Sequence, residues 1–401
     1  MSLSERVTPS VLIIGAGPAG LASAYALRQR GIAFALVERS QRVGDTWASV
    51  YPSLRLNTTR FYSHMPDMRF PLGYGIFASG AQYHQYLQAY AAKHRFPIQF
   101  ERAVQRVSRA SDGIHWQVSY ADGATEYYPA VISATGVFGN PSLPHIEGMD
   151  SYQGTLIHAH DYRHTEQLRG RRVLVVGTGP SGVDIAVAAA QVAHSTAIAI
   201  RSGIDLRRRY PLGLPQQMWL MLALNLPRRT CHALMRTVGK RGFPEQARYG
   251  LARPQQGGLT AYQGRELLDL AKAGKVTPVR APVRFHPHSI ELDDGTFNDA
   301  DMVIMATGYE PVLHQYLDVP MQFSQSAWQA PAPCDWEIGP NGQRGFPLLD
   351  RSQHPNGRQV LGQAGLYIVG VYYKGKGALY NMPLEARIAS QQIADYLARM
   401  E

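Results

Sequence analysis

Two glycine-rich turns are the segments of this sequence whose residue types and spacing are best suited to chemistry. Each follows a four-residue apolar run and precedes an alanine-rich stretch of helical character. In such a turn the first glycine permits the tight bend, the second lets a pyrophosphate approach the backbone, and the third lets helix and strand pack closely. The start of the helix adds unpaired N–H groups and partial positive charge. The candidate phosphate-binding residues are Gly15, Gly17, Pro18, Ala19 and Gly20 in the first turn and Gly177, Gly179, Pro180, Ser181 and Gly182 in the second.

A charged residue at the end of the next apolar run predicts which nucleotide each turn binds. After the first turn this residue is Glu38, followed by Arg39, and a carboxylate there accepts hydrogen bonds from ribose hydroxyls. After the second turn it is Arg201, whose guanidinium can pair with a 2′-phosphate that a carboxylate would repel. Such a charge-assisted bond contributes about 1.5–3 kcal/mol. We therefore expect FAD on the first turn, and NADPH in preference to NADH on the second. Three more arginines either extend this phosphate site or form a solvated loop: Arg207, Arg208 and Arg209.

A second repeated pattern accompanies the glycine turns. The sequence Ala-Thr-Gly ends a buried apolar run at 134–136 and again at 306–308, in the same order after each turn. Two matches in the same order predict two related dinucleotide-binding units. We therefore expect an α/β fold with two Rossmann-like domains, the second inserted in the first. The pattern adds these candidate cofactor-binding residues: Ala134, Thr135, Gly136, Thr307 and Gly308.

The order of these segments also predicts the domain boundaries. Residues 1–150 and 310–401 would form the FAD-binding domain, and residues 151–309 the NADPH-binding domain, with a helical subdomain near 205–255. The apolar run 365–370 would return to the first sheet. A loop at Gly375–Gly377, near the flavin ring, would then lead into a final helix from about Pro383 to Arg399.

Composition supports a globular protein and disfavours several other classes. Of the 401 residues, 45% are hydrophobic and 17% charged, which excludes a disordered or fibrous chain. No apolar stretch approaches the roughly 20 residues of a membrane-spanning helix, and the N-terminus lacks a signal-peptide pattern, so we expect a cytoplasmic protein. The net charge is +10, and the segment from Arg201 to Arg253 carries +9, with eleven Lys/Arg and two acids. No recognisable nucleic-acid-binding module accompanies it, so we expect no nucleic-acid partner. Two cysteines without CxxC spacing exclude a disulfide framework.

Three further segments match the pattern of a known family. The stretch 152–162, YQGTLIHAHDY, resembles the FxGxxxHxxxY fingerprint of flavin-containing monooxygenases, with Tyr152 in place of phenylalanine. Gly44, Thr46 and Trp47 match the segment that lies along the flavin in that family, and 51–71 resembles its Y…N…PD…FP segment. Over essentially the whole chain, the sequence therefore resembles the class B flavin-dependent monooxygenases, which include flavin-containing monooxygenases, YUCCA enzymes and Baeyer–Villiger monooxygenases.

This resemblance implies cofactors, a reaction and two catalytic candidates. NADPH would reduce FAD, and the reduced flavin would trap dioxygen as a C4a-(hydro)peroxide that oxygenates a small molecule, with nitrogen or sulfur favoured. Asn57 matches the asparagine that faces the flavin oxygen site in the family, so it is both a catalytic and a cofactor-binding candidate. His158 would couple NADPH binding to flavin chemistry, or would only hold the linker backbone. The cofactors carry this chemistry, so neither a metal nor a nucleophilic side chain is needed.

Other reactions stay open on the same fold. Baeyer–Villiger oxygenation of a carbonyl is one, and oxidative decarboxylation of a 2-oxo acid, as in YUCCA enzymes, is another. Tyr162 and Asn57 favour heteroatom oxidation, because typical Baeyer–Villiger enzymes have tryptophan at the first position and YUCCA sequences usually differ at the second. The stretch 249–254 is instead YUCCA-like. A flavin disulfide reductase would need a dithiol, which Cys231 and Cys334 do not provide.

The surroundings of the reaction can also be anticipated. A site that excludes water needs apolar walls, for which Trp47 and the Tyr372–Tyr373 pair are candidates, whereas we expect Phe61 and Tyr62 to pack in the core. The segment 216–241 predicts a subdomain helix over the mouth of the site, with a basic helix touching a membrane surface as the alternative. The expected partners are thus a small-molecule substrate and dioxygen, and the protein could form a homodimer.

Overall fold

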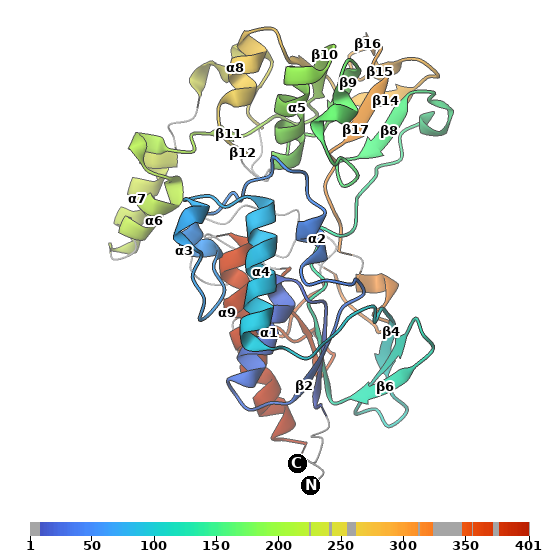
Figure 1. The fold of residues 1–401 in the computed structure, drawn as a ribbon, viewed down its shortest axis with the longest axis vertical. Coiled ribbons are helices and arrows are strands. Elements are labelled where there is room, and N and C mark those ends of the chain that lie inside the picture. The colour runs from blue at the N-terminus through green and yellow to red at the C-terminus, as the bar shows by residue number, and fades with distance from the viewer. Residues whose placement is uncertain are drawn as a thin grey trace.

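Two parallel sheets organise the chain, one above the other in Figure 1. The computed structural model describes residues 9–223, 226–239, 243–254, 262–311, 313–323, 347–354, 356–371 and 377–400. The first sheet and the elements packed on it are called the first unit below, and the second sheet with its elements the second unit. The helices α6 (Gln216–Ala223) and α7 (Arg228–Gly239) project to one side between them.

The first unit is a five-stranded parallel sheet with helices on one face. Its strand order is β18-β7-β1-β2-β3, and the strands are β1 (Val11–Ile14), β2 (Phe34–Val37), β3 (Ile98–Gln99), β7 (Ala130–Ser133) and β18 (Leu366–Ile368). Successive side chains of a strand point to opposite faces. Ile13 accordingly packs among α1 (Pro18–Arg28), α4 (Gly80–His94) and α9 (Ala378–Leu397). Leu12 faces the antiparallel strands β4 (Val104–Arg109), β5 (Trp116–Tyr120) and β6 (Thr125–Tyr128).

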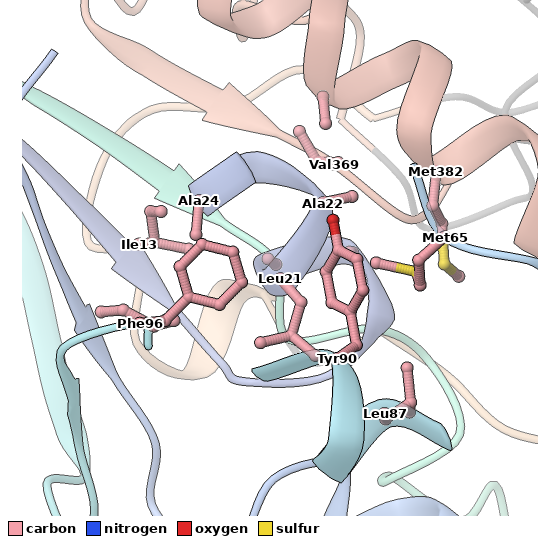
Figure 2. Packing of buried hydrophobic residues seen from close by; sticks show 14 of the residues in the cluster. Ile13, Leu21, Ala22, Ala24, Met65, Leu87, Tyr90, Phe96, Val369 and Met382 are labelled. Atoms are coloured by element: carbon pink, nitrogen blue, oxygen red, sulfur yellow. The ribbon is translucent and has the colours of Figure 1, made fainter. Parts of the chain in front are cut away.

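The helical side of this sheet forms the largest apolar cluster among the described residues, and Figure 2 shows part of it. Leu21 of α1, Leu87 and Tyr90 of α4 and Met382 of α9 meet there. Burying each large apolar side chain contributes about 1.5–3 kcal/mol. The cluster therefore fixes α1, which begins at the first glycine turn, against the sheet.

The second unit repeats this plan. Its strand order is β13-β10-β9-β17-β8, with β8 (Thr155–His158), β9 (Arg172–Val176), β10 (Ser195–Ala199), β13 (Thr277–Val279) and β17 (Met302–Met305), all parallel. Val175 packs with α5 (Pro180–Val192) and α8 (Glu266–Lys272), whereas Leu174 faces the antiparallel strands β14 (Pro282–Phe285), β15 (Ile290–Leu292) and β16 (Phe297–Asn298). The predicted α/β fold with two Rossmann-like units is confirmed.

Short elements complete the described chain. They are α2 (Asp45–Ala48), α3 (Arg60–Ser63), β11 (Leu206–Arg207) and β12 (Tyr262–Gln263), and the 3₁₀ turns η1 (Leu72–Tyr74), η2 (Met149–Ser151), η3 (Thr165–Leu168), η4 (Pro211–Gly213), η5 (Pro244–Tyr249) and η6 (Leu313–Gln315). Across the ranges given above, every helix is too short or too polar to cross a membrane.

Three local expectations need correction. The last helix begins at Ala378, so Pro383 lies inside it and not at its start; packing of α9 on α1 outweighs the loss of one N–H donor. Within the segment 216–241, the described residues form two helices, α6 and α7, and not one. Phe61 is 40% exposed rather than buried, whereas Tyr62 is buried as expected.

Candidate active site

The first glycine turn lies where β1 ends and α1 begins. Gly15 has a φ of +102°, and a Cβ there would lie 2.9 Å from the Ala134 carbonyl oxygen at the end of β7. A Cβ on Gly20 would lie 1.8 Å from the Gly15 carbonyl oxygen, whereas a Cβ on Gly17 would meet nothing within 4 Å. The first and third glycines are therefore required by packing. The second instead leaves open space before the helix N-terminus, where a pyrophosphate fits.

The second turn reproduces this geometry between β9 and α5. Gly177 has a φ of +123°, and its Cβ would lie 2.3 Å from the Ala306 carbonyl oxygen at the end of β17. A Cβ on Gly182 would lie 2.1 Å from the Gly177 carbonyl oxygen, while Gly179 again faces open space. Pro180 takes the first position of α5, where a missing N–H costs nothing. The donor sets of both turns thus fit a dinucleotide phosphate.

Glu38 holds the first turn through both of its carboxylate oxygens. Its Oε2 accepts a hydrogen bond of 2.7 Å from the Ala16 N–H, and its Oε1 one of 3.0 Å from the Ser40 N–H. Carboxylate oxygens can accept further bonds, so ribose hydroxyls can still be bound. The loop after Glu38 returns to the turn, because the Gly44 N–H donates to the Ala16 carbonyl at 3.1 Å.

The other flavin-side candidates surround this turn. Trp47 is half-buried on α2 with its ring edge-on to Tyr83, 4.5 Å between centroids, and Thr46 precedes it. The exposed Arg39 lies beside Gly139, just before the residues 140–142 that contact the second unit. Thr135 and Gly136 follow β7, and the Thr135 hydroxyl lies 3.3 Å from that of Tyr316.

Arg201 lines a groove on the second unit, and the sequence did not predict this groove. The groove is lined by Arg201, Ser202, Gly203, Arg253 and Arg280, among others. Arg280 is paired with Asp293 through contacts of 2.8 and 3.1 Å. The exposed side chains of Arg201 and Arg253, from segments far apart in sequence, thus face one groove. Arg253 is the residue that sequence reasoning missed here, since only the fold of the helical region returns it to the end of β10.

Two antiparallel links join the units. The Ser142 N–H donates to the Gly308 carbonyl at 2.9 Å, and the Glu310 N–H to the Asn140 carbonyl at 3.0 Å. The Thr307 hydroxyl donates to the Ser142 carbonyl. The predicted Ala-Thr-Gly segment of the second unit therefore also takes part in the links between the two units.

His158 lies at the end of β8, beside these links, and is 3% exposed. Its Nδ1 accepts a hydrogen bond of 2.9 Å from the His160 N–H, and its ring lies edge-on to Tyr309, 5.2 Å between centroids. Its Nε2 is buried without a hydrogen bond of good geometry. Burial lowers the pKa of His158 below its usual 6.5, and the Gly308 backbone offsets this in part. The neutral imidazole is therefore favoured, with Nδ1 as the acceptor and the proton on Nε2.

Asn57 is exposed, on a partly buried segment that the helical region holds in place. Gln217 of α6 accepts a hydrogen bond of 2.6 Å from the Thr59 N–H and donates one of 3.3 Å to the Asn57 carbonyl. A Cβ on Gly377, where α9 begins, would lie 2.5 Å from the Thr58 side chain. The structure thus joins Asn57 to α6 and to the start of α9. Tyr372, Tyr373, Gly375 and Cys334 lie outside the described residues.

Comparison with known proteins places this architecture in a family. The model of the flavin-binding monooxygenase-like family matches residues 8–325. A probable indole-3-pyruvate monooxygenase, YUCCA9 of Arabidopsis thaliana, is 30% identical over 378 residues, covering 91% of this chain and 84% of that protein.

Solved structures share the fold. A flavin-containing monooxygenase from Stenotrophomonas maltophilia has a TM-score of 0.70 at 24% identity, covering 97% of this chain and 98% of that one. The open structure of a cyclohexanone monooxygenase has a TM-score of 0.66 at 15% identity, covering 98% and 88%. The chain belongs to the flavin-binding monooxygenase-like family, and it is a monooxygenase that depends on FAD and NADPH.

Proposed function

We propose that this enzyme uses NADPH and dioxygen to oxygenate a small molecule at nitrogen or sulfur. The observation that carries the proposal is the duplicated glycine turn. Open space at Gly17 and at Gly179 is combined with a carboxylate, Glu38, at one strand end and a guanidinium, Arg201, at the other. This charge difference suits a ribose hydroxyl on one side and a 2′-phosphate on the other.

The two units would divide the cofactors. Residues 1–150 and 310–401 would hold FAD through the first glycine turn, Glu38, and the segments at 44–47 and 134–136. Residues 151–309 would hold NADPH through the second turn, Thr307, Gly308 and the groove of Arg201 and Arg253. Bound FAD supplies hydride acceptance and dioxygen activation; the chain must then orient it and exclude water.

Asn57 and His158 are the proposed residues at the reacting side. The amide of Asn57 would donate to oxygen bound at the flavin, and Gln217 would keep its backbone in place. His158 would offer its buried Nε2 to the nicotinamide nucleotide. If it does, His158→Ala should raise hydrogen peroxide release per NADPH oxidised; an unchanged ratio of peroxide to product would leave this histidine a structural residue only.

A second candidate is oxidative decarboxylation of a 2-oxo acid. It is favoured by the curated relatives, since YUCCA9 of Arabidopsis thaliana and YUCCA1 of Oryza sativa subsp. japonica, 30% and 28% identical, are named as indole-3-pyruvate monooxygenases. The YUCCA-like stretch at 249–254 contains Arg253 of the groove.

One experiment tests both candidates. The FAD-loaded protein is reduced with NADPH without oxygen, mixed rapidly with aerated buffer, and offered amines, thioethers, ketones and 2-oxo acids in turn. Coupled product with an amine or thioether supports the proposal, and carbon dioxide release from a 2-oxo acid supports the second candidate. Failure of NADPH to bleach the flavin would contradict both. A cytoplasmic location and a homodimer stay predictions from the sequence.

A further inference from the structure

Tyr51 belongs to the first unit in sequence and to the second unit in packing. It lies between α2 and α3, yet its side chain, 6% exposed, is part of the apolar core that contains Tyr162 and Val175. Its ring lies 5.9 Å from that of Tyr162, and Leu54 packs against the same core. A side chain of one unit is therefore built into the interior of the other.

The Tyr51 hydroxyl contacts a carboxylate on α5, the helix that follows the second glycine turn. It donates to Oδ2 of Asp184 at 3.0 Å, and Ser181, in the glycine turn itself, also hydrogen-bonds this hydroxyl. A second link runs alongside, since the Arg163 guanidinium donates to the Ser49 carbonyl at 2.8 Å. The segment that leads to Asn57 is thus tied to the start of α5.

Asp184 has partners from each neighbouring element. Tyr51 and Tyr262 of β12 hydrogen-bond its carboxylate, Arg209 after β11 faces it as a cation, and Glu266 of α8 faces it as an anion. Burial raises its pKa to about 6; the bonds from the two tyrosines and the charge of Arg209 oppose that rise, and Glu266 adds to it. A charge-assisted hydrogen bond is worth more than a neutral one, so this contact is a strong link for its size.

We propose that Tyr51 is a positioning residue that, through its hydrogen bond to Asp184, holds the phosphate-binding helix of the second unit in the orientation required for NADPH to reduce the flavin. This inference rests on the proposed assignment of FAD to the first unit and NADPH to the second. Its contacts are with Asp184, with Ser181 and with the core of the second unit. It would act on the angle between the units, because it ties the first unit to α5 at a point separate from the links at Ser142–Gly308 and Asn140–Glu310.

The test removes only the hydroxyl. In Tyr51→Phe the ring still fills the second core, so FAD content and reduction by dithionite, which needs no NADPH domain, should be unchanged. Anaerobic reduction by NADPH should slow about tenfold, the loss expected for one charge-assisted bond. Asp184→Asn, which removes the acceptor charge, should slow it similarly, and the double variant should be no slower than either alone.

A matched control is available within the first unit. Tyr120 is 1% exposed and donates to Glu126 Oε2 at 2.8 Å, and Glu126 also accepts from Tyr128, as Asp184 does from two tyrosines. This contact does not cross between units. Tyr120→Phe should therefore leave reduction by NADPH at the wild-type rate.

The pH dependence of the unfolding free energy, through the carboxyl group of Asp184, gives a second measurement that does not depend on activity. Because the bond from Tyr51 lowers the pKa of Asp184, Tyr51→Phe should raise it further. The difference in unfolding free energy between the wild type and Asp184→Asn should fall as the pH rises from about 4 to 6. When both proteins also carry Tyr51→Phe, the same difference should continue to fall at higher pH. Urea unfolding at a series of pH values measures it.

The outcomes separate the two claims. Wild-type flavin that NADPH does not bleach would defeat the proposed function. The inference alone would be overturned, with the proposed function intact, by either of two results. In the first, NADPH reduces the flavin of Tyr51→Phe as fast as that of the wild type and the pH range of the stability change does not move. In the second, Tyr120→Phe slows reduction as much as Tyr51→Phe does.

Discussion

At the scale of single residues, the glycines of each turn meet two different requirements, close packing of the turn and open space for a ligand. The sequence motif alone does not tell which glycine meets which. Gly20 is needed because of a carbonyl oxygen 1.8 Å from its Cβ position, whereas Gly17 has free space around it. Packing therefore requires the third glycine, whereas the second is the one that a bound pyrophosphate would require. The same distinction holds for Gly182 and Gly179 in the second unit.

Substitution by alanine should display this difference. Gly20→Ala should destabilise the protein by about 1–3 kcal/mol, as overpacking does, and should lower the melting temperature. Gly17→Ala should melt like the wild type and yet lose most of its FAD, measured by flavin absorbance after gel filtration. Equal FAD content in Gly17→Ala and wild type would contradict a phosphate at this turn.

The groove on the second unit gives another residue-scale prediction. Arg201→Ala should raise the KM for NADPH by roughly ten- to a hundredfold and leave the KM for NADH nearly unchanged, because only NADPH has the 2′-phosphate. Arg253→Ala should act in the same direction if it faces the same groove. Arg280→Ala is the comparison, since Arg280 is already paired with Asp293. Steady-state kinetics with both nucleotides measures this, and parallel losses for NADPH and NADH would contradict the assignment.

At the scale of elements, α6 acts as a clamp on the segment that carries Asn57. Gln217 presents its amide to one backbone N–H and one backbone carbonyl, as a neighbouring strand would. This contact favours the prediction of a helix over the mouth of the site. Exposed apolar side chains on the same region, such as Leu222 at 61%, leave membrane contact a prediction to be tested with vesicles.

Loss of the clamp should uncouple the reaction. Gln217→Ala removes both bonds, at a cost of about 1–3 kcal/mol, and should free the backbone of 57–59. FAD content and reduction by NADPH should persist while hydrogen peroxide release rises relative to product. Gln216→Ala, one residue earlier in the same helix, is the control, and equal uncoupling in both variants would argue against a specific role for Gln217.

At the scale of the whole molecule, segments from distant parts of the chain close each sheet. Strand β18 pairs with β7, and helix α9 packs against α1. Figure 1 shows the two helices side by side. Glu385 of α9 and Arg358 are both fully buried, 3.7 Å apart, and Glu385 accepts a hydrogen bond of 2.7 Å from the Gly370 N–H after β18. Burial raises the pKa of Glu385 to about 7, against the opposing effects of Arg358 and the Gly370 N–H.

Global stability should therefore depend on pH in a defined direction. The folded protein holds a proton on Glu385 at pH values where the unfolded chain, with a pKa near 4.5, has lost it. Wild-type stability relative to Glu385→Gln should thus be fully present below about pH 4.5 and fall by at most about 3 kcal/mol as pH rises to 7. Urea unfolding at several pH values checks this, and parallel pH profiles for the two proteins would contradict it.

The sequence predicted the features that depend on residues close together in the chain, and it missed those that depend on distant ones. The two glycine turns, the apolar strands before them and the charges at Glu38 and Arg201 were predictable, because each depends on neighbours within one βα unit. The start of α9 was not, because packing on α1 overrides the tendency of Pro383 to begin a helix. Nor was the exposure of Phe61, since the adjacent pair Phe61 and Tyr62 carries no signal of which of the two rings faces the core.

The sequence by itself determined the two glycine turns and the repeat that relates them, and it predicted a class of cofactor for each, since local backbone conformation and charge suffice for these. Only the tertiary structure decided that Arg253 joins Arg201, that Gln217 clamps the Asn57 segment and that Tyr51 enters the core of the other unit. These contacts join residues far apart in the chain, and their geometry arises only when the two sheets are packed and linked.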